Sequence, residues 1–248
     1  MRMRFTWCEL LLVVCLMGML GALALGMTPR DKAREVYCAD KLRALLRVSH
    51  RYVTDHRGMW MAPCDLRSGA YVRPLAMGGY LKTPWKTLMT ARETELTCPE
   101  LPRVSRWKVM QGYGAVYNNG SSYDPQIGIY IYSPEYAFVG TGKNRREVTW
   151  SKRIWFADSL NVAKPPFPSP LLFGHLPRYL KGGENFGAVN ITHSGKANIG
   201  AVDGSVSAVA PEELKEYYFP VTGSKPPRHY SAPLRLYLDG GKAKTAAK

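Results

Sequence analysis

One uninterrupted hydrophobic stretch lies near the start of the chain and runs from Leu10 to Met27, with the thiol of Cys15 as its only ionisable side chain. A helix through this stretch rises about 27 Å, close to the roughly 30 Å hydrocarbon thickness of a bilayer. Glu9 directly precedes the stretch. A carboxylate costs about 2.5 to 3.5 kcal/mol at the bilayer centre, so Glu9 needs a partner charge or a shallow position. The pattern predicts a transmembrane helix over residues 5–27 and makes Glu9 a functional candidate.

A second helical pattern, this one amphipathic, follows between Arg30 and about Asp55. Thr28-Pro29 has the form of a helix cap followed by a first-turn proline, and Gly58 is a usual helix-ending residue. The apolar positions at helical spacing are Cys38, Leu42, Leu45, Leu46 and Val53. We therefore predict one amphipathic helix within residues 28–57.

For the remaining body, residues 58–239, the sequence predicts loops, short strands and one short helix at about 211–218. Runs of β-branched and aromatic residues mark strands at 127–132, 136–139, 153–157, 188–191, 198–202 and 205–209. Asp203-Gly204 between the last two strands predicts a type I′ hairpin turn, with positive φ at both residues. The small, polar and basic segment 240–248 predicts a disordered tail. The length and this order of elements predict one α+β domain after the N-terminal helices.

Charge and cysteine content narrow the function classes. The net charge of +15 would suit an anionic surface ligand, but the basic residues are dispersed, and no zinc-finger or glycine-rich phosphate motif accompanies them. Scattered charge favours a solvated basic surface, so we expect no specific nucleic-acid partner. Cys38, Cys64 and Cys98 allow one disulfide and one free thiol in an exported body. We favour Cys38 with Cys98, because the rigid extended Cys98-Pro99 dipeptide could lie along the helix that carries Cys38.

The N-terminal sequence resembles the processing signal of type IV prepilins and type II secretion pseudopilins. Phe5-Thr6-Trp7-Cys8-Glu9 precedes the aliphatic helix, where that family has Phe-Thr-Leu-Ile-Glu. The resemblance implies cleavage by a prepilin peptidase between Arg4 and Phe5, methylation of the new amino terminus, and pairing of Glu9 with the amino terminus of a neighbouring subunit. Arg4 stands where the family usually has Gly. The leader would be residues 1–4.

A C-terminal signature supports the same resemblance: His193, nine further residues, then Asp203-Gly204. This spacing is similar to that of a large group of bacterial prepilin-type proteins. Other stretches that fit the group are Tyr37-Cys38, Thr97-Cys98-Pro99, Gly112-Tyr113-Gly114 and Trp155-Phe156-Ala157-Asp158. The resemblance implies a pilin-like fold, with the long N-terminal helix packed on a small antiparallel β-sheet. It also implies a single-pass protein of the bacterial inner membrane with a periplasmic or cell-surface body, partnered by other pseudopilin subunits and an inner-membrane assembly platform.

The signature residues themselves do not predict an enzyme. Residues 197–202 read as a strand, which at about 3.3 Å per residue separates His193 from Asp203 by roughly 20 Å and argues against a shared metal. We expect Asp203 to shape a turn and His193 to bond backbone. Asp158 with His193, each at a strand end, is the candidate ligand or cation position. No nucleophile with a placed base is found, so we expect no catalysis, no cofactor and no metal.

Four other interpretations remain open at the level of sequence. Ala22-Leu23-Ala24 also offers the cleavage site of an ordinary secretory signal, and the helix could be a simple uncleaved anchor. A surface binding module for polysaccharide or another anionic ligand could use pilin-type export and the aromatic residues Trp60, Trp85, Trp107 and Tyr113. An envelope hydrolase would depend on His193 or Asp158.

Overall fold

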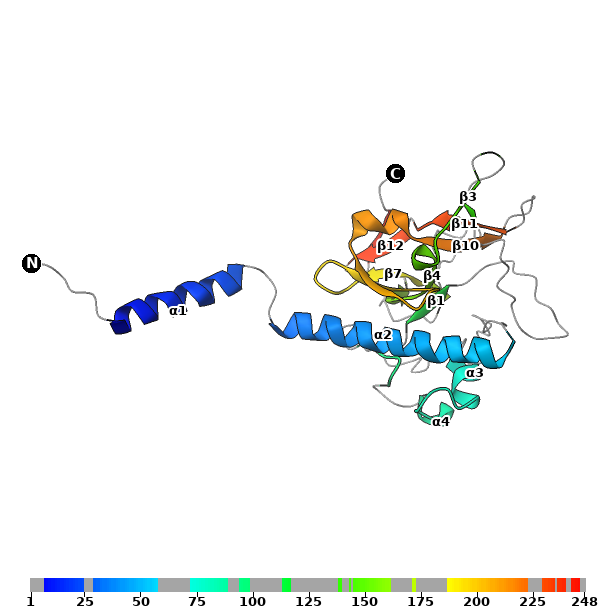
Figure 1. Ribbon diagram of the computed structural model, residues 1–248, viewed down its shortest axis with the longest axis horizontal. Helices are drawn as coiled ribbons and strands as arrows, with labels where there is room; N and C mark the ends of the chain where they lie inside the picture. Colours follow the sequence, from blue (N-terminus) through cyan, green and yellow to red (C-terminus); the bar gives the residue numbers. More distant parts are fainter. Residues whose placement is uncertain are drawn as a thin grey trace, which may run out of the picture.

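The structure of the 248-residue chain is a computed structural model. It describes residues 7–24, 29–57, 72–88, 94–98, 113–116, 138–139, 143, 145–161, 171–172, 187–222, 229–234, 236–239 and 242–245. The fold is mixed helix and sheet, as predicted. Figure 1 shows a body of β-strands, a long helix lying along it, and a second helix that extends away from the body at the N-terminal end.

The helices are concentrated in the first third of the chain. Among the described residues they are α1 (Trp7–Ala24), α2 (Pro29–Asp55), α3 (Val72–Met77) and α4 (Trp85–Leu88), and the short 3₁₀ helices η4 (Trp150–Lys152) and η5 (Pro211–Glu216) lie farther on. The predicted amphipathic helix is confirmed as α2, while α3 and α4 lie where only loops and short strands were predicted. Among the described residues, no helix has both the length and the hydrophobicity needed to cross a membrane. The segment predicted to do so, residues 5–27, extends past both ends of α1.

The strands form two sheets. They are β1 (Gly114–Val116), β2 (Phe138–Val139), β3 (Arg146–Glu147), β4 (Ile154–Ala157), β5 (Ser159–Asn161), β6 (Leu171–Leu172), β7 (Gly187–Ile191), β8 (Ala197–Ala201), β9 (Val206–Val209), β10 (Tyr218–Thr222), β11 (His229–Pro233), β12 (Leu236–Asp239) and β13 (Lys242–Thr245). The larger sheet has nine strands in the order β13-β12-β7-β6-β1-β4-β8-β9, with β5 also paired to β7, and the smaller has the order β10-β11-β2-β3. The strands predicted at 153–157, 188–191, 198–202 and 205–209 correspond to β4, β7, β8 and β9.

The sheets differ from the predicted small antiparallel sheet in size and in part of their pairing. Antiparallel pairs predominate, but β1 with β6, β6 with β7, β12 with β7 and β11 with β2 are parallel. The tail predicted to be disordered contains β13, which pairs antiparallel with β12 and contradicts that prediction for residues 242–245. The Lys244 ammonium donates a hydrogen bond to Asp239 on the neighbouring strand β12. The alternating basic residues here therefore belong to an edge strand, where lysine is common, and not to a free tail. The strand predicted at 127–132 lies outside the described residues.

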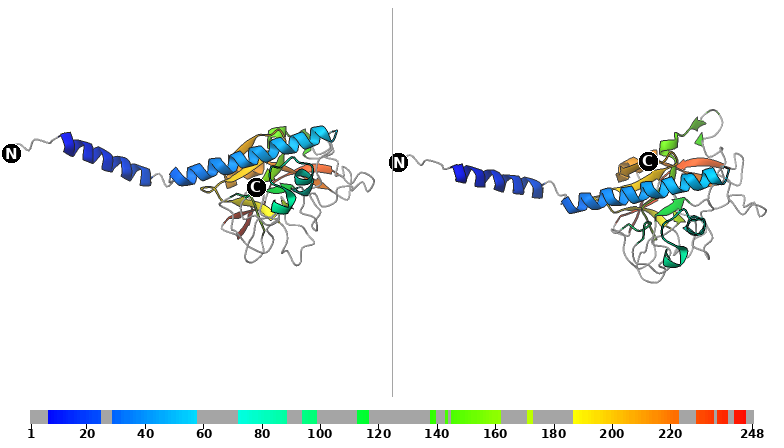
Figure 2. Two further views of the ribbon diagram at one scale, coloured as in Figure 1. Left: turned by 90° about the horizontal axis from the view of Figure 1, so that it is seen from below. Right: turned by 60° about the horizontal axis from the view of Figure 1, so that its bottom comes forward.

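Helix α2 covers one face of the larger sheet, contacting β4, β8 and β9 (Figures 1 and 2). Its buried face includes Cys38, Leu42, Leu45 and Leu46, four of the five positions that the helical spacing predicted, and the fifth, Val53, is partly buried against the same core. A Cβ at Gly200 on β8 would lie 2.9 Å from Leu46 Cδ1 and 3.3 Å from Leu42 Cγ, so glycine there allows the helix its close approach to the sheet.

A β-bulge in β4 sends two consecutive large side chains towards α2. The register between β4 and β8 shifts between Ile154 and Phe156, and both Trp155 and Phe156 join the core beneath the helix. Ile154 and Ala157 lie instead in a second core with Ile199 and residues of η5 and β10. The larger sheet is therefore buried on both faces around β4 and β8, which places any polar side chain there in the protein interior.

Candidate functional site

The N-terminal candidate residues are only partly described. The processing residues Arg4 and Phe5 lie outside the described residues, whereas Glu9 is exposed in the first turn of α1. The positive end of the helix dipole favours a carboxylate at that place. Around it, α1 exposes large apolar side chains, including Trp7 at 81% and Met17 at 69%. The structure thus has an acidic group at the start of an apolar helix whose hydrophobic surface is uncovered in the isolated chain.

A second candidate site lies in the interior and begins with His193. The turn between β7 and β8 has positive φ at Ser194 (49°) and Gly195 (82°), as a type I′ hairpin requires. His193 and Lys196 close this turn with two backbone hydrogen bonds of 2.9 Å. His193 is 3% exposed, so the hairpin carries a histidine into the core. The Ser-Gly dipeptide that encodes this turn was not used in the sequence prediction.

Asp158, between β4 and β5, holds the histidine from the other side. Its Oδ2 lies 3.2 Å from His193 Nε2 and accepts a 2.7 Å hydrogen bond from the backbone N–H of Asn198. Its Oδ1 is buried and has no hydrogen-bond partner among the described residues. The structure therefore brings together the two residues proposed from sequence as a ligand or cation position.

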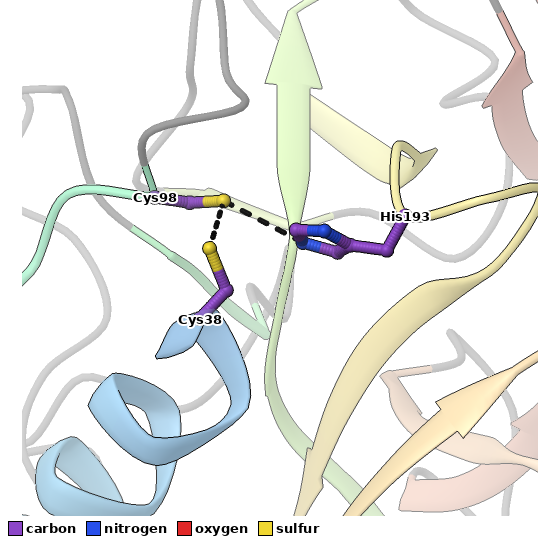
Figure 3. Close-up of side chains that lie close together, drawn as sticks. All are labelled: Cys38, Cys98 and His193. Atoms are coloured by element: carbon purple, nitrogen blue, oxygen red, sulfur yellow. Dashed lines mark hydrogen bonds between the residues drawn. The ribbon is translucent and has the colours of Figure 1, made fainter. Parts of the chain in front are cut away.

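Two cysteines complete the cluster, as Figure 3 shows. Cys38 of α2 and Cys98 are both fully buried, with their Sγ atoms 2.6 Å apart, and Cys98 Sγ lies 3.5 Å from His193 Nε2. The Tyr113 hydroxyl donates a 2.6 Å hydrogen bond to the Cys38 carbonyl. The favoured cysteine pair of the sequence analysis is thus adjacent in space, and the histidine beside it was not foreseen.

The cluster shifts the titration of its members in opposite directions. Burial lowers the pKa of His193, but hydrogen bonds and charge from Asp158 and Cys38 outweigh burial and raise that pKa to about 10. The hydrogen bond from Cys98, aided by His193 and opposed by burial, lowers the pKa of the Cys38 thiol to about 6. Burial, with the charge of Asp158, raises the pKa of Tyr113. The arrangement therefore favours an imidazolium beside a thiolate and a carboxylate.

Metal binding is one use that this residue set suggests. Single donor atoms of Cys38, Cys98 and His193 all lie within 4.8 Å of one another. Tetrahedral zinc, with zinc–sulfur bonds of about 2.3 Å, would hold two thiolate sulfurs about 3.8 Å apart. The observed 2.6 Å between the sulfurs is far shorter and lies nearer the roughly 2.05 Å of a disulfide bond. The geometry fits a sulfur pair better than a metal centre.

Asp203 and Gly204, the other signature residues, lie at the opposite end of β8 from His193 and do not join the cluster. Asp203 Oδ1 accepts hydrogen bonds from the Ser205 N–H (2.9 Å) and hydroxyl (2.6 Å), which shapes the turn between β8 and β9. Only Gly204, with φ of 89°, has positive φ, so the predicted type I′ turn is wrong here. The Ala201 N–H donates to the Ser205 carbonyl and the Gly204 N–H donates to the Ala201 carbonyl, so residues 202–204 form a three-residue loop, one residue longer than the predicted two-residue loop.

The aromatic residues considered for polysaccharide binding do not form an exposed array in the described part of the chain. Tyr113 is fully buried, and Trp85 is half-buried against the core beneath α2. Trp60 and Trp107 lie outside the described residues.

Comparison of the chain with family models, curated proteins and solved structures found no match.

Proposed function

We propose that this chain is a pseudopilin-like structural subunit. It would be processed by a prepilin peptidase before Phe5, retained in the bacterial inner membrane by its N-terminal helix, and assembled with other pseudopilin subunits by an inner-membrane platform. The subunit belongs to a type II secretion or type IV pilus-like apparatus, and its body lies on the periplasmic or cell-surface side. It performs no catalysis.

The observation that carries the proposal is the apolar surface of α1. Its exposed residues include Leu10, Leu11, Leu12, Val14 and Met19, and they are not confined to one stripe of the helix. A helix that is apolar on all sides is stable only where lipid or other apolar helices surround it. In Figures 1 and 2 α1 extends away from the body, as an element that pairs with neighbouring subunits would.

The first turns of α2 support the same assembly. Val36 is 51% exposed and Tyr37 47% exposed, whereas Leu42, Leu45 and Leu46 farther along the helix are buried against the sheet. The helix thus changes from an uncovered N-terminal part to a C-terminal part that packs against the body. This change would let one end bind neighbouring helices while the other end carries the body.

Glu9 supplies the specific contact in this scheme. A carboxylate among apolar helices is costly unless a cation neutralises it. After cleavage, the amino terminus of Phe5 on a neighbouring subunit is a cation of matching chemistry. The pair would favour one stagger between adjacent helices, because other staggers separate the two charges.

Amino-terminal sequencing of the mature protein, purified from cells that contain a prepilin peptidase, tests the proposal. We expect a chain that starts at Phe5, and we expect Arg4→Gly to raise the processed fraction because it restores the residue usual before the cut. A chain that starts at Leu25 would show processing as an ordinary secretory protein. An unprocessed chain, in the original sequence and in the Arg4→Gly variant alike, would also refute the proposal.

A further inference from the structure

The buried cysteine pair lies where three distant segments of the chain meet. Cys38 belongs to α2, Cys98 ends the segment 94–98, and His193 precedes the hairpin turn between β7 and β8 (Figure 3). The 94–98 segment is fixed to α2 by Lys41, whose ammonium donates hydrogen bonds of 2.9 Å and 3.0 Å to the carbonyls of Thr94 and Thr97. Lys41 lies about one helical turn from Cys38 on α2. Its hydrogen bonds therefore hold the 94–98 segment so that Cys98 lies beside Cys38.

Acid–base groups face the two sulfurs from the sheet. His193 Nε2 is 3.5 Å from Cys98 Sγ and 3.2 Å from Asp158 Oδ2, and a ring nitrogen of His193 lies within 4.8 Å of the Cys38 sulfur. The Tyr113 hydroxyl faces the same place but is committed to the Cys38 carbonyl. A proton that leaves a thiol can therefore move to the imidazole, where the Asp158 carboxylate stabilises the resulting charge.

We propose that Cys38 and Cys98 form a disulfide bond and that residues of this chain assist its formation. His193 takes the thiol proton, and Asp158 is the residue that positions His193. The oxidant is the disulfide of an external dithiol protein or of a small-molecule thiol. The proposal rests on the proposed function only in that export supplies an oxidising compartment.

The reaction consists of two exchange steps. Cys98, on the non-helical segment, first attacks the external disulfide before 94–98 docks on Lys41, which forms a mixed disulfide and releases one thiol. Docking then brings the mixed disulfide to Cys38. Cys38 transfers its proton to His193, its thiolate attacks Cys98 Sγ, and the second external thiolate leaves and takes that proton. Two cysteine thiols are oxidised, and one external disulfide is reduced to two thiols.

The contacts of His193 help to lower the pKa of the Cys38 thiol, and this contribution does not depend on the Cys98 thiol, so it still favours the attacking thiolate when Cys98 is in the mixed disulfide. The bond would link α2 to the body across 60 residues of chain. It would fix the helix that carries the assembly surface before the subunit joins a filament.

The test uses the full chain, reduced and then exposed to oxidised glutathione, with alkylation at timed intervals. Trypsin is expected to release peptide 35–41 linked to peptide 93–103. The rate for His193→Gln should fall about tenfold at pH 6 and approach that of the original chain at pH 9, where thiols ionise without help. The matched control is His50→Gln, since His50 packs edge-on against Trp155 with ring centroids 5.1 Å apart and belongs to no sulfur contact that the structure describes.

Asp158→Asn provides a second variant that keeps the imidazole, and we expect an intermediate rate at pH 6. An unchanged pH profile in both folded variants would overturn the role of His193. The disulfide site would be overturned if Cys64 were linked in place of either cysteine. It would also be overturned if the reduced chain retained one zinc ion and resisted oxidation. Because glutathione replaces the exported compartment, these outcomes are independent of where the N-terminus is cut.

Discussion

At the scale of single residues, the Asp158–His193 pair shows why a polar group in this core must be neutralised. Both side chains are almost fully buried, and an isolated charge in such surroundings is costly. Asp158 is stabilised by one backbone N–H and by the imidazole, and His193 by the carboxylate. Each therefore depends on the other, so removal of one leaves the partner in an unfavourable state.

The pair predicts a pH dependence of stability. The pKa of His193 is raised to about 10 in the folded chain, above its ordinary value of 6.5. Its stabilising contribution is therefore fully present below about pH 6.5, where the unfolded chain is also protonated, and is lost as the pH rises through about 10. Asp158→Asn should lower the free energy of unfolding by about 3 to 5 kcal/mol at pH 6 and flatten this decline.

Urea unfolding of the reduced chain at several pH values between 6 and 10 measures the effect. Asp203→Asn is the matched control, because it changes an exposed carboxylate on a turn and leaves His193 unaffected. An equal decline with pH in Asp158→Asn and the original chain would show that the pair contributes no such term.

At the scale of elements, α2 organises the body through its C-terminal half and through Lys41. Its C-terminal half buries leucines against β8, where Gly200 allows the close approach, and Lys41 holds the 94–98 segment. These contacts are of different kinds: the leucines supply hydrophobic stabilisation, and Lys41 satisfies carbonyl groups that would otherwise need water.

Replacing Lys41 by Met should release the 94–98 segment while leaving α2 helical. The loss of two hydrogen bonds from a charged donor should lower the free energy of unfolding of the reduced chain by about 1.5 to 3 kcal/mol. It should also slow closure of the Cys38–Cys98 pair. Arg43→Met is the control on the same helix, since the exposed Arg43–Asp40 pair contributes little. Equal effects of the two substitutions, in urea unfolding and in alkylation rate, would contradict the docking role of Lys41.

At the scale of the whole molecule, the exposed N-terminal helix, proposed to mediate assembly, is separate from the globular body. Helix α1 and the first turns of α2 expose apolar side chains, while the sheets and α2 enclose the buried cluster. In the proposed function, the N-terminal helix determines where the subunit goes and with what it pairs, and the disulfide site keeps the body attached to α2 in one orientation.

Glu9→Gln tests the assembly role directly. It removes the charge while keeping the shape of the side chain, so we expect normal cleavage before Phe5 but at least a tenfold loss of incorporation into filaments, consistent with a buried pair worth several kcal/mol. Immunoblots of processed chain and of sheared or cross-linked filaments measure the two quantities. Glu212→Gln, an exposed carboxylate of η5, should change neither. Normal incorporation of the Glu9→Gln chain would contradict the pairing role.

The motifs quoted from the sequence show which features of the buried cluster a sequence pattern can predict. Tyr37-Cys38, Thr97-Cys98-Pro99, Gly112-Tyr113-Gly114, the Asp158 motif and His193 were each noted separately, and each contributes a buried group to one cluster. That they lie in one cluster could not be predicted from their spacing along the chain, because 60 residues separate the cysteines and 95 separate Cys98 from His193. The predicted Asp203–Gly204 turn was placed correctly but given the wrong type, and the neighbouring type I′ turn at Ser194–Gly195 was missed.

The sequence by itself determined the elements whose pattern is local. The buried face of α2 follows from the helical spacing of its apolar residues, and the strands β4, β7, β8 and β9 follow from runs of β-branched and aromatic residues, so both depend only on residues close together in the chain. Only the tertiary structure decided the two-sheet arrangement, the pairing of β13 into the sheet edge and the meeting of Cys38, Cys98, Asp158 and His193. These depend on contacts between residues far apart in the chain, which form only when packing brings whole elements together.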